Sequence, residues 1–284
     1  LHLATSRDGY QWSEIGPASH TWIQPKLGSR AMRDPCLRQG PDGTFHLVWT
    51  TGWRDKGFGY ARSRDLIRWS EQVWLPVNEK TAGAKNTWAP ELYYDSAGQK
   101  WLIVWATTIV GRFPEAGLHQ EETFGHRLYC TTTTDFKRFS KPRLFCDPGF
   151  NCIDGTLLES GGTFYLILKN ETKSAKCLQI CPGKTAEGPW GPASPPLPKP
   201  GEMVEGPSAL RIGNTYWIYF DSLQNRKWKY GAVTSEDLKT WKEVTNELLF
   251  PASGIRHATM IEVEPAVILR LQAAVGKHPQ PGIK

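Results

Sequence analysis

The chain has 284 residues, 39% of them hydrophobic, with 13 Trp, 9 Tyr and 11 Phe, which is enough apolar material for a sizeable core. It carries 34 Lys and Arg against 28 Asp and Glu, a net charge of +6. The basic residues are scattered and form no run, so they indicate a solvated surface and no nucleic-acid partner. No apolar stretch reaches membrane-spanning length, and we expect no membrane partner.

Two short phrases recur along the chain. Ser-x-Asp-x-x-x-Trp occurs as SRDGYQW, SRDLIRW and SEDLKTW, with TTDFKRF and KTAEGPW as altered copies. An apolar, aromatic-rich strand such as TFHLVWT or TYWIYFD precedes most copies. Five copies spaced about 50–70 residues apart are typical of repeated blades. The sequence therefore predicts an all-β protein, a five-bladed β-propeller with almost no helix.

Residues 1–15 predict two strands around a turn at Asp8-Gly9. They match the third and fourth strands of a blade, whose inner strand is then expected at the other end of the chain, at Arg256–Val263. Both termini would share this last blade, which closes the ring and removes its exposed edges. Residues 1–263 would form one catalytic domain.

The remaining blades follow in order, and a C-terminal extension ends the chain. The four blades are expected at residues 32–76, 88–145, 151–190 and 203–249. The longest insertion, Ile109–Arg127, predicts a functional loop over the channel mouth. In the extension, residues 264–284, Ala266–Ala274 fits either the missing strand of the last blade or a short helix, and the Pro before it and Gly276 after it favour the helix.

A third phrase opens each unit and contains the chemistry. It reads RDPCL, WAPEL, IDGTL, VEGPSAL and RHATM. Its second position is Asp34, Ala89, Asp154, Glu205 and His257 in turn. Because the inner strands of a propeller line its central channel, equivalent positions in different blades converge there. We expect three carboxylates and a histidine around one axial pocket.

Buried acids in apolar strands must be paired, metal-bound or catalytic. Two carboxylates suit glycoside hydrolysis, in which one acid protonates the leaving oxygen and another activates water or attacks. A third carboxylate would raise the pKa of the acid by like-charge repulsion. The alternative is that these groups hold an ion that only fills the channel.

The chain also resembles glycoside hydrolase family 43. The motifs that carry this resemblance are RDPCL, IDGTL and EGPSAL, together with TTGW, NTWAPELYY, GRFPE, DPGFN and GIRHAT. The resemblance covers residues 1–263 and implies an inverting mechanism in which Asp34 is the general base, Asp154 modulates the pKa of the acid and orients it, and Glu205 is the general acid. It further implies an exo-acting α-L-arabinofuranosidase that removes terminal furanosyl residues. Members of this family usually have a further strand before HLATSRDG, which this chain does not show.

Other site residues are predicted from position. Trp53 and Trp88 would stack on the apolar face of a sugar. Arg256 would donate to sugar hydroxyls or to Asp34, or form a structural ion pair. Arg112, in the long insertion, and Asp221 are further substrate-binding candidates, and Lys169 and Glu91 are weaker ones. His257 would contact a channel ion through water, since calcium itself prefers oxygen ligands.

Several expectations follow for partners and setting. No cofactor is required, although a structural Ca²⁺ in the channel fits the resemblance. The six cysteines allow disulfides in an exported protein, or are buried free thiols. We expect a monomer that is secreted or periplasmic and acts on an arabinose-containing glycan. The alternatives are a β-D-galactofuranosidase or β-xylosidase of the same fold, or a non-catalytic carbohydrate-binding propeller.

Overall fold

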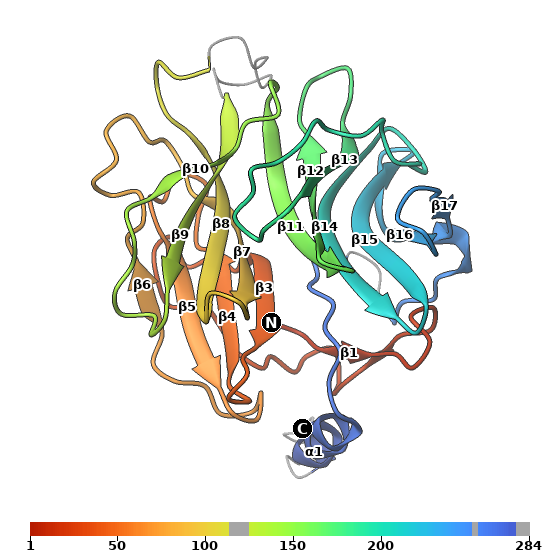
Figure 1. Ribbon diagram of the computed structural model, residues 1–284. Coiled ribbons are helices and arrows are strands. Elements are labelled where there is room, and N and C mark those ends of the chain that lie inside the picture. The colour runs from red at the N-terminus through yellow and green to blue at the C-terminus, as the bar shows by residue number, and fades with distance from the viewer. Residues whose placement is uncertain (114–124, 252–254, 277–284) are drawn as a thin grey trace.

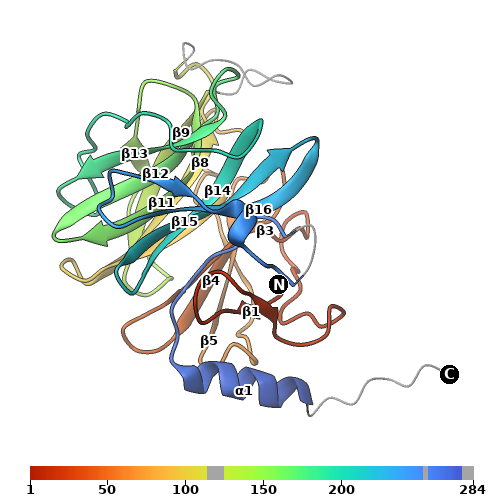
Figure 2. The ribbon, with the colours of Figure 1, turned by 90° about the vertical axis from the view of Figure 1, so that its right-hand side faces the viewer.

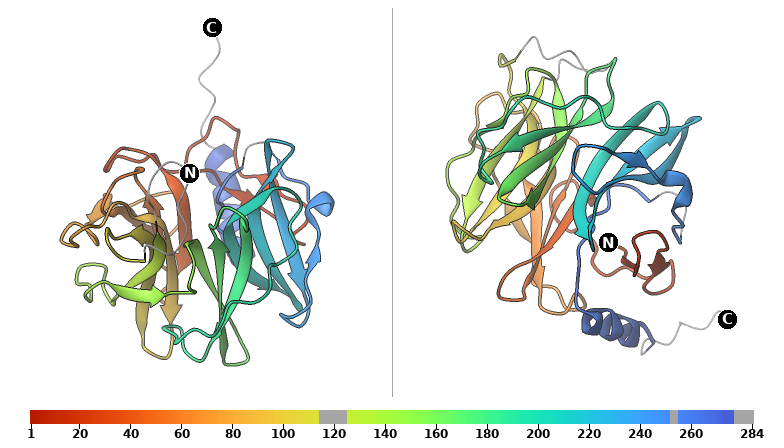
Figure 3. Two further views of the ribbon diagram at one scale, coloured as in Figure 1. Left: turned by 90° about the horizontal axis from the view of Figure 1, so that it is seen from above. Right: turned by 45° about the vertical axis from the view of Figure 1, so that its right-hand side comes forward.

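The computed structural model describes residues 1–113, 125–251 and 255–276. Four antiparallel sheets stand around a common axis as the blades of a β-propeller, which Figure 1 shows from the side and Figure 3 from above. The predicted all-β propeller is thus confirmed. The described residues form four sheets of three or four strands and one two-stranded sheet, so a fifth complete blade is not confirmed.

The strands follow one another within each sheet in chain order. The first sheet is β3 (Arg33–Gln39), β4 (Phe45–Thr50), β5 (Phe58–Ser63) and β6 (Val73–Leu75). The second is β7 (Trp88–Asp95), β8 (Lys100–Thr108), β9 (His126–Thr133) and β10 (Arg143–Cys146). The third is β11 (Cys152–Ser160), β12 (Thr163–Asn170) and β13 (Cys177–Gly183). The fourth is β14 (Met203–Ile212), β15 (Thr215–Gln224), β16 (Lys227–Ser235) and β17 (Lys242–Glu243), and the small sheet is β1 (Ala4–Thr5) with β2 (Ser13–Glu14).

The recurring Ser-x-Asp phrase forms a tight turn after the third strand of a blade. At Ser63, the hydroxyl oxygen accepts the N–H groups of Asp65 and Leu66. The Asp65 carboxylate accepts the N–H groups of Ile67 and Arg68, two and three residues further along the chain. Leu66 adopts a left-handed φ of 63°, which these bonds hold in place. The carboxylates of Asp8, Asp135 and Asp237 bind their own turns in the same way.

Each inner strand contains a bulge at the predicted channel position. The pairing register shifts within β3, β7, β11 and β14, and the bulged residue has a left-handed φ: 49° at Asp34, 46° at Ala89, 53° at Asp154 and 61° at Gly206. His257 has the same conformation, with φ 43°. A bulge re-aims the side chain of the extra residue, and Asp34, Asp154 and His257 accordingly point at one another across the axis.

This register corrects one sequence alignment. The bulge position of the fourth inner strand is Gly206, so Glu205 occupies the position before it, where Arg33 and Arg256 stand in their own segments. A Cβ on Gly206 would lie 2.3 Å from Cδ2 of the His257 ring. Glycine is therefore required here, because the imidazole fills the space that a side chain at this position would occupy.

The last blade differs from its prediction. Residues 255–264 form no strand, so the expected inner strand Arg256–Val263 is wrong as a regular element. Its backbone is bound by side chains instead: the Met260 N–H donates to Ser208 Oγ of β14 at 2.8 Å, and the Tyr230 hydroxyl donates to the Ala258 carbonyl at 3.0 Å. The segment also contacts β3, where Thr259 Oγ1 accepts the N–H of Leu37 at 3.3 Å. The segment thus lies between the inner strands of the first and fourth sheets.

The C-terminal extension forms a helix, α1 (Pro265–Gly276), and the strand alternative is wrong. Val267 and Leu271 are buried against the core cluster that contains Ile15 and Leu47. Figures 1 and 2 show α1 at one end of the molecule, with β1 between it and the sheets. The only other helical turn in the described ranges is the 3₁₀ turn Thr245–Glu247. No helix of the described residues is long and apolar enough to span a membrane.

Candidate active site

His257 is the centre of the site. Its Nδ1 lies 2.9 Å from Asp34 Oδ1, and its Nε2 lies 3.4 Å from Asp154 Oδ2. Burial acts to lower the pKa of the imidazole, but the two carboxylates outweigh it and raise that pKa well above its usual value. His257 is therefore an imidazolium that holds two of the predicted catalytic carboxylates on opposite sides of one ring.

Asp34 is ionised in this setting. Burial acts to raise the pKa of its carboxyl, yet His257, the hydroxyl of Thr50 and the charge of Arg33 together lower that pKa to about 2. An aspartate that stays ionised at all ordinary pH values is available as a base. Thr50 belongs to β4, the strand next to β3, so the neighbouring strand helps to keep Asp34 ionised.

Asp154 is nearly buried and contacts the fourth sheet as well. Its Oδ2 accepts the N–H of Gly206 at 3.0 Å. That N–H belongs to the residue after Glu205, so Asp154 fixes the stretch of backbone that carries Glu205. No hydrogen bond joins the two carboxyl groups in the described structure, and the contact between Asp154 and the acid runs through the main chain.

Glu205 is held between two cations. Lys169 Nζ lies 2.6 Å from its Oε2, and the Arg256 guanidinium lies 2.5 Å from its Oε1. Burial acts to raise the pKa of Glu205, but Lys169, His257 and Arg256 lower it overall. The prediction of a raised pKa from neighbouring carboxylates is therefore wrong for the free site, because the charges of Lys169, His257 and Arg256 outweigh the effect of burial on Glu205.

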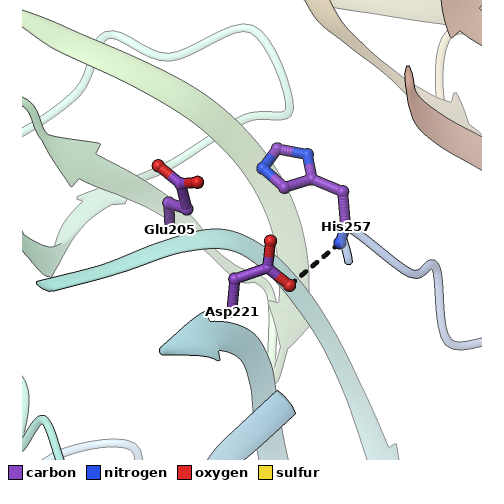
Figure 4. Close-up of side chains that lie close together, drawn as sticks. All are labelled: Glu205, Asp221 and His257. Carbon is purple, nitrogen blue, oxygen red and sulfur yellow. Dashed lines mark hydrogen bonds between the residues drawn. The ribbon is translucent and has the colours of Figure 1, made fainter. Parts of the chain in front are cut away.

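Asp221 lies behind Arg256 and is fully buried. Its carboxylate accepts from Arg256 Nε, and its other oxygen accepts the backbone N–H of His257 at 3.0 Å, which Figure 4 shows. Desolvation raises the pKa of Asp221 despite these donors. Arg256 also stacks on Trp228, 3.6 Å from the ring centroid. Asp221 thus positions both Arg256 and His257. The sequence suggested Asp34 as one possible partner of Arg256, but its partners in the structure are Glu205 and Asp221.

Lys169 was only a weaker candidate from the sequence, but the structure places it in direct contact with Glu205. Only 1% of its side chain is exposed, and its Nζ bridges Glu205 and Glu171, each at 2.6 Å. Glu171 in turn pairs with Lys176. The signal was a lysine at the end of an apolar strand, TFYLILK, which pairs in register with Ile153 beside the bulge at Asp154.

Trp53 and Trp88 lie together at the side of the site. Their ring centroids are 4.6 Å apart with a 44° tilt, and Trp88 Nε1 donates to the Trp53 carbonyl at 2.9 Å. Trp53 is 48% exposed, whereas Trp88 is only 8% exposed. This arrangement offers a sugar one accessible indole face beside the carboxylates.

One cavity of about 1010 Å³ joins these groups. Its lining includes Asp34, Asp154, Glu205, Trp53, Trp88, Arg256 and His257. It continues past the segment 255–263 to Leu3 and to Leu271 of α1, where the last blade has no full sheet. Two predicted binding residues do not line it: Asp221, which lies behind Arg256, and Arg112, which is exposed elsewhere. Most of the insertion that should flank the mouth, residues 114–124, lies outside the described residues.

The residues around His257 do not fit a directly bound calcium ion. Ligand atoms of Glu205, Asp221 and His257 lie within 4.8 Å of one another, but the Arg256 guanidinium already pairs with both carboxylates. A cation there would have to replace Arg256 beside an imidazolium. A smaller cavity of about 30 Å³ lies along the axis, between His257 and Glu91, and has room for one water-sized group. A water-bound ion in that cavity stays a prediction.

The six cysteines are all buried and free, which supports the free-thiol alternative. Burial raises the pKa of Cys130 and Cys152 to about 12, so both thiols stay protonated. Cys36 packs beside the channel, where its sulfur accepts the N–H of Leu92 at 3.2 Å. None of the six lies in the set of residues that lines the large cavity.

Comparisons of the sequence with known proteins find glycosyl hydrolases. A family model described as a probable glycosyl hydrolase domain, related to family 43, matches residues 1–266. An α-L-arabinofuranosidase of Bifidobacterium longum subsp. longum is 26% identical over 170 residues. That match covers 52% of this chain but 16% of the relative, so this chain spans a small part of that protein.

Solved structures share the fold at low identity. An α-L-arabinofuranosidase from Lactobacillus brevis aligns over 75% of this chain and 72% of its own, with 19% identity and a TM-score of 0.58. The catalytic domain of a Coprinopsis cinerea family 62 α-L-arabinofuranosidase aligns over 84% and 73%, with 16% identity and a TM-score of 0.57. A family 43 β-1,3-galactosidase aligns over 79% of both chains, with 15% identity and a TM-score of 0.56. With the family model spanning nearly the whole chain, the protein belongs to the glycosyl hydrolase family related to glycoside hydrolase family 43.

Proposed function

We propose that this glycoside hydrolase is an exo-acting, inverting α-L-arabinofuranosidase. The observation that carries the proposal is the convergence of Asp34, Asp154 and Glu205 on one cavity beside an exposed indole. Asp34 is the base, because its carboxylate stays ionised and can take a proton from water. Glu205 is the acid that protonates the leaving oxygen, and Asp154 fixes the main chain that carries Glu205.

The two cations on Glu205 set a condition for this role. An acid must hold a proton, and Lys169 and Arg256 both favour the ionised form. Lys169 is locked by burial and by Glu171, whereas the Arg256 side chain is 38% exposed. Arg256 is therefore the partner that an incoming sugar displaces. Its departure raises the proton affinity of Glu205, while Lys169, which lowers the pKa of Glu205 more strongly, stays in place. A site in which the sugar moves no cation would suit carbohydrate binding without catalysis.

The test is a panel of nitrophenyl glycosides. The α-L-arabinofuranoside should give the highest kcat/KM, and the β-D-galactofuranoside and β-D-xylopyranoside are the alternatives. Turnover of none of the three, with measurable binding of arabinan fragments, would indicate a binding propeller. Products from linear arabinan test exo action: arabinose alone at the earliest times supports it, and early oligosaccharides of mixed length contradict it. Because such glycans lie outside cells, we also propose that the protein is exported. We further propose that it is a monomer, which sedimentation velocity tests.

A further inference from the structure

Trp53 is the only exposed aromatic side chain in the described part of the chain. Its loop is nevertheless held by several hydrogen bonds. The Asp55 carboxylate accepts the Ser29 N–H at 2.9 Å, the Ser29 hydroxyl at 3.0 Å and the Thr51 hydroxyl at 2.7 Å. The indole N–H of Trp88 fixes the Trp53 carbonyl. An exposed indole that is held in place at the wall of the cavity offers a surface on which the apolar face of a sugar can stack.

Arg33 faces this ring, with its guanidinium carbon 5.3 Å from the ring centroid. No carboxylate pairs with Arg33 in the structure as described. The contrast with Arg256 is direct, because both stand just before a bulge residue of the axis. Arg256 is neutralised by Asp221 and Glu205, whereas the residue that pairs with Arg33 across the sheet is the uncharged Thr50. Arg33 is thus a cation on the cavity wall whose guanidinium has no carboxylate in contact among the described residues.

We propose that Trp53 and Arg33 form a subsite for a hexuronate, a sugar that bears a carboxylate, next to the sugar that is cleaved. This inference rests on the proposed function and names its substrate class. The apolar face of a pyranose ring stacks on an indole, and a planar guanidinium binds a carboxylate through two parallel hydrogen bonds. Both residues line the cavity that contains Asp34 and Glu205, and Arg33 directly precedes Asp34 in the chain, so an occupant of the subsite lies beside the base.

Arg33 also contributes to the low pKa of Asp34. Its removal could therefore slow the reaction of every substrate. A ratio between two substrates removes this effect, because the base acts on both alike. The measured quantity is consequently the ratio of kcat/KM for a uronate-linked substrate to that for its neutral counterpart.

The experiment uses three disaccharides with one terminal arabinofuranose, linked to galacturonate, to its methyl ester or to galactose. The wild type should prefer the free galacturonate about tenfold over both others, as one charged hydrogen-bonded contact allows. Arg33→Gln should bring the ratio to about 1, and Arg33→Lys should keep part of it. Added salt should lower the wild-type ratio, because an exposed ion pair is screened. Arg64→Gln, an exposed arginine paired with Asp42 elsewhere, is the control and should leave the ratio unchanged.

A wild-type ratio near 1, or a ratio that Arg33→Gln leaves unchanged, overturns the subsite. An equal preference for the methyl ester also overturns it, because the ester has no charge. If no arabinofuranoside is cleaved, the proposed function fails, and calorimetry with the same disaccharides still decides the subsite. Tighter binding of the galacturonate form, lost in Arg33→Gln, then supports it, and equal binding of all three forms contradicts it.

Discussion

Lys169 Nζ lies 2.6 Å from Glu205 Oε2 and equally close to Glu171, with only 1% of the lysine side chain exposed. A cation in this position stabilises the ionised form of Glu205 and lowers its pKa. The acid of the proposed mechanism is therefore coupled to a group that opposes its protonation.

Replacing Lys169 tests this coupling. Lys169→Met should raise the pKa of Glu205, so the protonated acid persists to higher pH and the alkaline limb of kcat/KM moves upward. The protein should lose about 3–5 kcal/mol of stability, because Glu205 and Glu171 each lose the buried one of their two cationic partners. Lys176→Met is the matched control, since Lys176 pairs with Glu171 but not with Glu205. An alkaline limb that does not move in Lys169→Met would show that Glu205 is not the titrating acid.

Leaving-group dependence separates the acid from the base. Glu205→Gln should lower kcat on oligosaccharides by about 10²–10⁴-fold but spare activated aryl glycosides, because a good leaving group needs little protonation. Asp34→Asn should lower kcat on both kinds, since water then has no base. Steady-state rates on arabinobiose and on a dinitrophenyl arabinofuranoside provide the comparison. Equal losses on both substrates in Glu205→Gln would contradict its assignment as acid.

The stereochemical outcome follows from the position of the base. Asp34 belongs to the first sheet and Glu205 to the fourth, and an inverting pair needs a gap of roughly 6.5–9.5 Å for the attacking water. We expect the first product to have the inverted configuration. Proton NMR of the anomeric region within the first minutes of hydrolysis measures this. Retention would assign Asp34 as a nucleophile.

Much of this site could be read from the sequence, and the exceptions have physical reasons. Asp34 and Asp154 could be predicted because the motifs that contain them, RDPCL and IDGTL, have the same length and align without a gap. The sequence alignment places Glu205 one residue off, because it matches Glu205 to Asp34 and Asp154. The true equivalent of those two residues is Gly206, which must be glycine to leave space for the His257 ring. Lys169 is underrated because its role depends on cross-strand pairing with Ile153, which a single strand does not reveal. The inner strand at residues 256–263 is wrong because no neighbouring strand pairs with it, and side chains bind its backbone instead.

Acid stability depends on Asp34. Its pKa of about 2 in the folded protein lies below the value of about 3.9 for an unfolded aspartate. The resulting stability is present above pH 4 and is lost as pH falls through 2, and it amounts to about 2 kcal/mol. Urea unfolding between pH 5 and pH 2 should show this loss, and the Asp34→Asn variant should show a correspondingly flatter dependence. Parallel curves for the two proteins would mean that His257 does not depress the pKa of Asp34.

Gly206 tests whether the position of His257 controls the site. Both Gly206 and Gly161 adopt left-handed φ values, 61° and 58°, so an alanine at either position has a similar backbone cost of about 1–2 kcal/mol. They differ in their surroundings: a Cβ at Gly206 would meet the His257 ring at 2.3 Å, whereas one at Gly161 has no atom within 4 Å. Gly206→Ala should therefore displace the imidazole from Asp34 and Asp154 and lower kcat/KM by about 100-fold or more, as expected for an ångström-scale misplacement in an active site. Gly161→Ala should unfold at lower urea but keep its kcat/KM. The ring-proton shifts of His257 in NMR spectra should change in the first variant only, and equal activity in the two variants would show that the site tolerates a displaced His257.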